Sequence, residues 1–423
     1  MKSSVRRFIA SLFESQVKRL IARHNLKVIA LAGSVGKTST KMAVAAVLSE
    51  KYRTLVHPSN YNSELGLPLS VFELGVPSVL FNPFAWALRL IQSERMLRNY
   101  PYKVLVLELG TDHPGEIARY FGYLTPDIGI LTALTPEHME NFPGGLDEVA
   151  AEELVLASKS KIFIVNDDAV PKKYQTQYLG SHPSVIHYGS RADNRWIAPG
   201  AFSVGGEKYE VKTRVIGEHI KVALLAGAVV GREFNISPRQ IEHALENFRP
   251  VAGRMNPLPG CNGSTIIDDT YNSSPEAVIA GLETLATYPA NGRRIALLGS
   301  MNELGTDSRR YHEEVGSAAA GVDLLVTIGA HANDYLGPAA VRAGLDPTRF
   351  KPSDSPFAAG EFIKSLLMAG DVVLAKGSQN GVFAEEAVKI LLHNPSDVAH
   401  LVRQSPSWIR AKSKQFPISL GSK

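Results

Sequence analysis

The feature that most constrains the fold is an apolar run, residues 28–32, that passes into a glycine turn and then into a helix-forming segment. This order is typical of a phosphate-binding loop, because glycines let backbone N–H groups approach an anion and the following helix presents its positive end. The spacing is G-x-x-G-K-T, with Leu31 where the common motif has its first glycine. Lys37 can reach the β- and γ-phosphates of a nucleotide, and the Thr38 hydroxyl can ligate Mg²⁺. The predicted loop comprises Gly33, Ser34, Val35, Gly36, Lys37, Thr38 and Ser39.

Composition sets the class of protein. A chain of 423 residues is too long for one hydrophobic core, so we expect more than one domain. Its 44% hydrophobic and 20% charged residues are typical of a globular protein, and the net charge of +4 includes no basic block suited to nucleic acid. The single cysteine, Cys261, excludes an intramolecular disulfide and a cysteine zinc cluster. No apolar run reaches the ~18 residues of a membrane span. These features predict a cytoplasmic protein.

Short apolar runs alternate with helical segments and predict an α/β protein with parallel sheets. In the first half these runs are residues 104–109, 128–132 and 162–165. After Pro250 the pattern restarts with 265–267, 295–298, 324–328 and 372–375. Two doubly wound α/β domains fit this order best. We therefore divide the chain into an amphipathic N-terminal helix (1–27), a central P-loop-containing domain (28–250) and a Rossmann-like C-terminal domain (251–423).

Polar side chains stand at the ends of three predicted strands. Glu108 follows a buried strand, where a Mg²⁺ ligand or a water-orienting carboxylate belongs, although carboxylates there also cap helices. His138 follows the next strand on the same edge and is either functional or a satisfied structural histidine. In the second half, the acids and the amide of residues 268–272 can bind ribose or adenine from across a cleft, or can simply cap a helix. From the residues alone, this last choice stays open.

Collinear motifs make the chain similar to the Mur ligase family. They are residues 33–39, 60–68, 108–117, 253–255 and 268–272. Three further motifs resemble the branch that adds D-alanyl-D-alanine: residues 298–305, 312–316 and 370–378. The resemblance runs in consistent order from about residue 28 to residue 392. It implies a central ATP-binding Mur ligase domain followed by a C-terminal Mur ligase domain.

The resemblance implies an ATP-dependent amide-bond ligase of cell-wall precursor synthesis. The family transfers the γ-phosphate of ATP to an acceptor carboxylate, and an amine then displaces phosphate from the acyl phosphate. The expected substrates are a muropeptide-type acceptor and a D-Ala-D-Ala-type amine. Lys37 would hold the γ-phosphate, Thr38 and Glu108 would carry one Mg²⁺, and His138 would help to hold a second cation. Phosphoryl transfer depends mainly on positioning and charge neutralisation, so no nucleophilic triad is needed.

The remaining site residues follow from the same resemblance. Arg254, Asp269 and Asn272 are expected to bring the second domain onto the nucleotide. Asn60, Asn62 and Glu64 belong to a loop that the family places near the acceptor. Closure of the two domains would then complete the site.

The chain also departs from the family pattern. Glu153 stands where most members carry a carbamylated lysine, and we hypothesise that it supplies the carbamate's negative charge; a solvated helix glutamate is the alternative. The family's G-x-H-N-x-x-N segment reads Gly217-Glu218-His219-Ile220-Lys221-Val222-Ala223, so adenine must be held differently. Only residues 1–27 precede the first predicted strand, where the branch has a UDP-sugar-binding domain.

These departures leave alternatives open. The acceptor could be UDP-free or lipid-linked, the enzyme could be a folate-type polyglutamate ligase, or the chain could be a non-catalytic nucleotide-binding partner subunit. The helix at 1–27 and the segment 79–96 combine apolar and basic residues. They are compatible with contact to a membrane surface, but packing on the domain or on a second subunit is the favoured interpretation.

Overall fold

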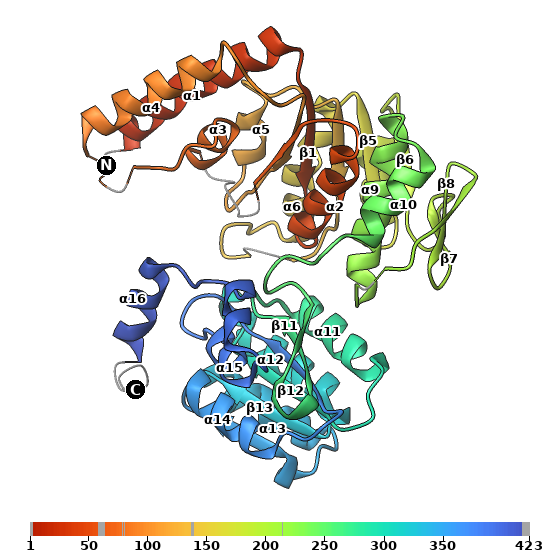
Figure 1. Cartoon of the computed structure of the whole chain (residues 1–423), viewed down its shortest axis with the longest axis vertical. Helices are drawn as coiled ribbons and strands as arrows, with labels where there is room; N and C mark the ends of the chain where they lie inside the picture. Colours follow the sequence, from red (N-terminus) through yellow and green to blue (C-terminus); the bar gives the residue numbers. More distant parts are fainter. Residues whose placement is uncertain are drawn as a thin grey trace. The chain divides into compact units, whose positions relative to one another are not determined.

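The structure, a computed structural model, describes residues 3–57, 64–77, 79, 81–136, 139–213 and 215–416, with only the backbone for Ser3, Glu218 and His219. The chain forms two compact units. Unit 1 comprises Met1–Thr213 and Val222–Phe248, and unit 2 comprises Arg214–Lys221 and Arg249–Lys423. In Figure 1 the colours run from red in unit 1 to blue at the end of unit 2.

Unit 1 is built on a parallel sheet with the strand order β2-β3-β1-β4-β5-β6. Strands β3 and β4 are buried along their whole length, as expected for apolar runs covered by helices on both faces. The strands are β1 Lys27–Ala32, β2 Thr54–Val56, β3 Val104–Glu108, β4 Ile128–Leu131, β5 Ile162–Asn166 and β6 Val185–Tyr188.

Helices and a small antiparallel sheet complete unit 1. The helices are α1 Ser3–His24, α2 Lys37–Ser49, α3 Gly66–Val71, α4 Pro83–Met96, α5 Glu116–Tyr120, α6 Leu146–Glu153, α7 Val155–Lys159, α8 Lys172–Leu179, α9 Glu218–Glu233 and α10 Pro238–Glu246. The small sheet consists of β7 Arg195–Ala198, β8 Ala201–Val204 and β9 Glu207–Glu210. Helices α1 and α4 lie side by side as a long pair (Figure 1).

The register of the sheet brings three strand ends to one edge. Leu31 of β1 pairs with Glu108 of β3, and Ala32 pairs with Leu131 of β4. Because the strands are parallel, the segments that follow them emerge at the same carboxyl edge, where α/β folds place their ligands.

Unit 2 has a second sheet with the order β10-β11-β15-β12-β13-β14, parallel except for β10. Its strands are β10 Asn256–Pro259, β11 Thr265–Asp269, β12 Arg294–Gly299, β13 Leu324–Ile328, β14 Phe350–Ser353 and β15 Val372–Lys376. Its helices are α11 Pro275–Thr287, α12 Ser308–Ala318, α13 Gly337–Arg342, α14 Pro356–Leu366, α15 Glu385–Leu391 and α16 Pro406–Gln415. The predicted α/β architecture is confirmed.

The apolar side of the N-terminal helix is covered only in part. The sequence pattern puts Val5, Phe8, Phe13, Val17 and other apolar residues on one side of the helix. In the structure Phe13 and Val17 are fully buried, but Val5 and Phe8 are 49% and 64% exposed. Periodicity identifies an apolar side but not how far along the helix a neighbour covers it. Within the described part of the chain, no helix is long and apolar enough to cross a membrane.

Candidate functional site

The phosphate-loop motif forms the turn between β1 and α2. Gly33 has φ +124°, and a Cβ there would lie 2.5 Å from Thr132 Oγ1, so only glycine fits. Gly36, with φ 84° in the left-handed region, is the N-cap of α2. The turn therefore places the amino end of a 13-residue helix at the carboxyl edge of the sheet. Such an end attracts anions through its N–H groups and dipole.

The segment after β4 holds this loop in shape. Ser34 N–H donates to Ala133 O at 3.0 Å, and the Ser34 hydroxyl donates to Thr135 O at 2.9 Å. The Thr132 hydroxyl donates to Val35 O at 2.6 Å. The loop thus keeps its turn through contacts with a neighbouring strand end as well as through its glycines.

Lys37 folds back over the loop. Its ammonium donates to the carbonyl of Gly33 and, at 3.5 Å, to that of Ser34. The predicted γ-phosphate ligand therefore lies against the backbone that would surround the anion.

Thr38 and Glu108 meet across the end of β3. The Thr38 hydroxyl donates to the Glu108 carboxylate at 3.1 and 3.3 Å, and both residues are buried. A hydroxyl and a carboxylate are the hard oxygen ligands that Mg²⁺ takes, so this pair fits the predicted metal. Among the described residues, no group of three or more His, Cys, Asp or Glu side chains could hold a metal ion.

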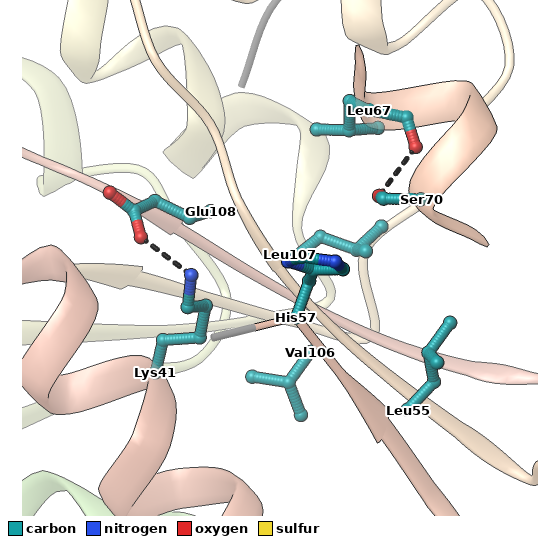
Figure 2. Close-up of a pocket in the computed structure, with 8 residues that line it drawn as sticks. All are labelled: Lys41, Leu55, His57, Leu67, Ser70, Val106, Leu107 and Glu108. Atoms are coloured by element: carbon teal, nitrogen blue, oxygen red, sulfur yellow. Dashed lines mark hydrogen bonds and ion pairs between the residues drawn. The ribbon is translucent and has the colours of Figure 1, made fainter. Parts of the chain in front are cut away.

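Lys41 was not predicted as part of the site. One turn along α2 from Lys37, its ammonium lies 2.9 Å from Glu108 Oε2, and both side chains are more than nine-tenths buried. Figure 2 shows Lys41 reaching from its helix toward Glu108. A lysine in a helix of small and apolar residues was the available signal, because a buried ammonium needs a partner. The adjoining cavity of about 20 Å³ also meets His57, Leu67 and Ser70 and has room for about one water.

Glu153 lies beneath the loop at the end of α6. Its Oε2 accepts a hydrogen bond from Gly33 N–H at 2.7 Å, and the side chain is fully buried. Its Oε1 is buried without a described hydrogen-bond partner. The pKa of Glu153 is raised, mainly because the side chain is buried. The charge of Lys37 and the hydrogen bond from Gly33 N–H lower this pKa, and the charge of Glu152 raises it. The orphaned oxygen fits a cation or a donor, and the side chain is not a solvated helix glutamate.

In unit 2, the paired acids of β11 organise the neighbouring turns. Asp269 Oδ2 accepts from Lys376 Nζ at 2.6 Å, and Oδ1 accepts from Met255 N–H at 3.2 Å. Asp268 accepts from Gly253 N–H at 3.0 Å, and burial raises its pKa to about 6. Both Asp269 oxygens are thus engaged inside the unit, which suits a positioning role better than direct contact with a nucleotide.

Arg254 and Asn272 frame the same turn. The Arg254 guanidinium lies 4.2 Å from the ring centroid of Tyr271, while its buried Nε has no described partner. The Asn272 carbonyl accepts from Lys376 Nζ at 2.9 Å.

Arg403, near the C-terminus, was not predicted as part of the site, although its segment has the residue pattern of a docked tail. It donates to the carbonyls of Thr270 and Tyr271 at 2.5 and 2.9 Å and to Glu385 at 2.7 and 2.8 Å. Because its partners lie 18 and more than 130 residues away in sequence, no local pattern could identify it.

Of the three residues predicted to lie near the acceptor, the structure describes Glu64. Glu64 is ion-paired with Arg6 at 3.3 Å and Arg7 at 3.2 Å, both from the start of α1. Asn60, Asn62 and His138 lie outside the described residues. The structure therefore brings together Lys37, Thr38, Glu108 and Glu153 in unit 1, and Arg254, Asp269 and Asn272 in unit 2.

Comparisons place these motifs in known proteins. Residues 87–234 match the Mur ligase middle domain, and residues 253–379 match the Mur ligase glutamate ligase domain. UDP-N-acetylmuramoyl-tripeptide--D-alanyl-D-alanine ligase of Mycobacterium leprae is 28% identical over 411 residues, covering 88% of this chain and 74% of the relative. The Escherichia coli ligase of the same name is 28% identical over 318 residues, covering 72% of this chain and 64% of its own length.

Solved structures share the fold. A crystal structure of MurF from Acinetobacter baumannii superposes with a TM-score of 0.73 at 23% identity, over 93% of this chain and 80% of that one. MurF ligase from Thermotoga maritima in complex with ADP gives a TM-score of 0.71 at 23% identity, over 92% and 84%.

Proposed function

The chain belongs to the Mur ligase family, and we propose that it joins a D-alanyl-D-alanine-type amine to a UDP-muramoyl-tripeptide-type acceptor in the cytoplasm, at the cost of ATP. The observation that carries this proposal is the geometry of the phosphate loop. Lys37, Thr38 and Glu108 converge at the carboxyl edge of the sheet, beside the amino end of α2. That arrangement suits transfer of a γ-phosphate.

In the proposed reaction, the acceptor carboxylate attacks the γ-phosphorus of ATP and releases ADP. The amine then attacks the acyl phosphate, loses a proton and expels inorganic phosphate, leaving an amide bond. Lys37 and the N–H groups of the loop bind and orient the transferred phosphoryl group. Thr38 and Glu108 would hold one Mg²⁺, which neutralises phosphate charge, and His138 would help to hold a second cation.

The other residues support this centre. We propose that Glu153 fixes the Gly33 N–H and supplies negative charge beneath Lys37. Asp269 positions the turns that carry Arg254 and Asn272, which bind the nucleotide. Asn60, Asn62 and Glu64 remain our candidates for the acceptor side.

The test is phosphate release from ATP and Mg²⁺ with UDP-MurNAc-tripeptide and D-Ala-D-Ala, with product identified by mass. Release should require both substrates, be lost in Lys37→Ala and persist in Lys159→Ala, which changes an exposed lysine on α7. Nucleotide binding without release would contradict this substrate pair. Phosphate release with another acceptor would then indicate a different Mur-type ligase. Absence of phosphate release with every acceptor tested would indicate a non-catalytic partner subunit.

A further inference from the structure

An exposed apolar surface lies at one end of the α1–α4 pair. On α4, Phe84, Leu88 and Ile91 are 84%, 53% and 51% exposed. Their spacing puts them on one face of the helix. Phe81, just before α4, is 74% exposed. We call the following set the apolar tip: Val5, Phe8, Val79, Phe81, Phe84, Leu88 and Ile91.

Contacts between α1 and α4 show that the helices run parallel. The rings of Phe13 and Trp86 are 6.3 Å apart, Gln16 donates to Leu90 O at 3.3 Å, and Arg19 pairs with Glu94 at 3.0 Å. Extending this register toward the N-terminus brings the turn with Val5 and Phe8 beside the start of α4. Figure 1 shows α1 and α4 side by side, with the N-terminus of the chain at the end of the pair where α1 begins. The exposed residues therefore form one surface from two elements.

The tip is not needed to hold the helices together. The opposite faces of α1 and α4 already bury Ala10, Phe13 and Trp86 against Leu65 and Leu69. Exposed aromatic residues that are grouped together, and that the buried core does not need, indicate an interaction site for a protein or a membrane.

The net charge of helices α1 and α4 indicates which kind of partner covers the apolar tip. Residues 3–24 carry five basic and one acidic side chain and residues 83–98 carry three and one, which makes +6 where the whole chain has +4. Lys18, Arg23, Arg95 and Arg98 form no ion pair with any acid in the described part of the chain. Strong positive charge next to exposed Phe and Leu matches an anionic lipid surface.

We propose that the α1–α4 pair docks the protein on an anionic lipid surface. The pair lies along the lipid surface, so that the apolar tip enters the boundary between headgroups and acyl chains. Arg95 lies on the same face of α4 as Ile91, and Arg98 follows just after the helix. Both lie against the headgroups, with Lys18 and Arg23 further along α1. A symmetric dimer through the same tip fits less well, because it would bring two +6 surfaces together. The proposal is independent of the ligase reaction.

The test is sedimentation of the full chain with vesicles of phosphatidylglycerol and phosphatidylcholine, beside vesicles of phosphatidylcholine alone. Binding should require the anionic lipid and fall as NaCl is raised. Phe84→Ser with Leu88→Ser should weaken it by about a hundredfold, because each buried side chain contributes about one decade of affinity. Arg95→Gln with Arg98→Gln should weaken it and reduce its salt dependence.

The control is Met368→Ser, which changes an apolar residue of unit 2 that is 57% exposed, close to the 53% of Leu88, and should leave binding unchanged. Absence of binding at low salt, or equal loss in control and tip variants, would overturn the proposal. The proposal would also be overturned if light scattering showed that the wild type is a dimer and the tip variant a monomer, while neither of the two proteins sedimented with vesicles. Phosphate release in solution should be unaffected by the tip variant, which separates this test from that of the ligase activity.

Discussion

Glu153 accepts a hydrogen bond from the Gly33 N–H at 2.7 Å, joining the end of α6 to the phosphate loop 120 residues earlier in the chain. The side chain is wholly buried, and its second oxygen has no hydrogen-bond partner among the described residues. Because burial of an ion is costly, the charged form of this carboxyl group needs a neighbouring cation, and Lys37 lowers its pKa against the effect of burial.

Glu153→Gln tests that charge. The amide oxygen can still accept from Gly33, so the fold should persist, but the negative charge near Lys37 is lost. We expect phosphate release to fall by at least about tenfold, the size of one charge-assisted contact. The dependence on Mg²⁺ concentration should shift as well. Glu148→Gln on the same helix is the control, and normal release with unaltered Mg²⁺ dependence in Glu153→Gln would contradict the proposed role.

Lys41→Met tests the buried pair with Glu108. Removing the ammonium leaves the Glu108 carboxylate without its 2.9 Å partner, which should cost about 3–5 kcal/mol of stability. Mg²⁺ should restore more of this loss than it adds to the wild type, because the cation takes over the charge. Thermal unfolding with and without Mg²⁺ measures both effects. Lys159→Met is the control, and equal Mg²⁺ stabilisation in all three proteins would argue against a cation at Glu108.

Arg403→Ala tests the link between the C-terminal segment and the 270–271 turn. The variant leaves two backbone carbonyls and part of the Glu385 carboxylate without their donor, so we expect unit 2 to lose about 3 kcal/mol of stability. Hydrogen exchange should rise at residues 268–272. Arg410→Ala, at an exposed position of α16, should change neither quantity. Unchanged exchange in Arg403→Ala would show that the turn holds its own shape.

Asp268 predicts a pH effect on stability. Burial raises its pKa from 3.8 to about 6, so the folded state keeps a proton that the unfolded state loses. The contribution of Asp268 to stability is therefore fully present below pH 3.8 and is lost as pH rises through about 6.

Urea unfolding of the wild type and of Asp268→Asn between pH 4 and pH 7 measures this effect. The stability of the wild type relative to the variant should decrease across that range by up to about 3 kcal/mol. A difference that is constant or grows with pH would contradict the raised pKa.

Part of the site could be predicted from the sequence because it is local. Residues 33–39 carry their turn in consecutive positions, and Glu108 stands at the end of an apolar strand. Lys41 and Arg403 were missed because their roles depend on partners 67 and more than 130 residues away, respectively, that only packing brings near. Asp269 was predicted to help bring the second domain onto the nucleotide, and that stays a prediction; packing adds that its oxygens accept from Lys376 and from Met255 N–H.

The sequence by itself determined the α/β class, the four central strands of each large sheet, the phosphate loop and the family, because these follow from periodicity and from short runs of residues. Only the tertiary structure decided which charges are paired and which apolar residues remain uncovered. Phe13 and Phe8 belong to the same apolar side of α1, yet one is fully buried and the other is 64% exposed. The reason is physical: burial and pKa depend on neighbours in space, and α4 covers only part of that helix.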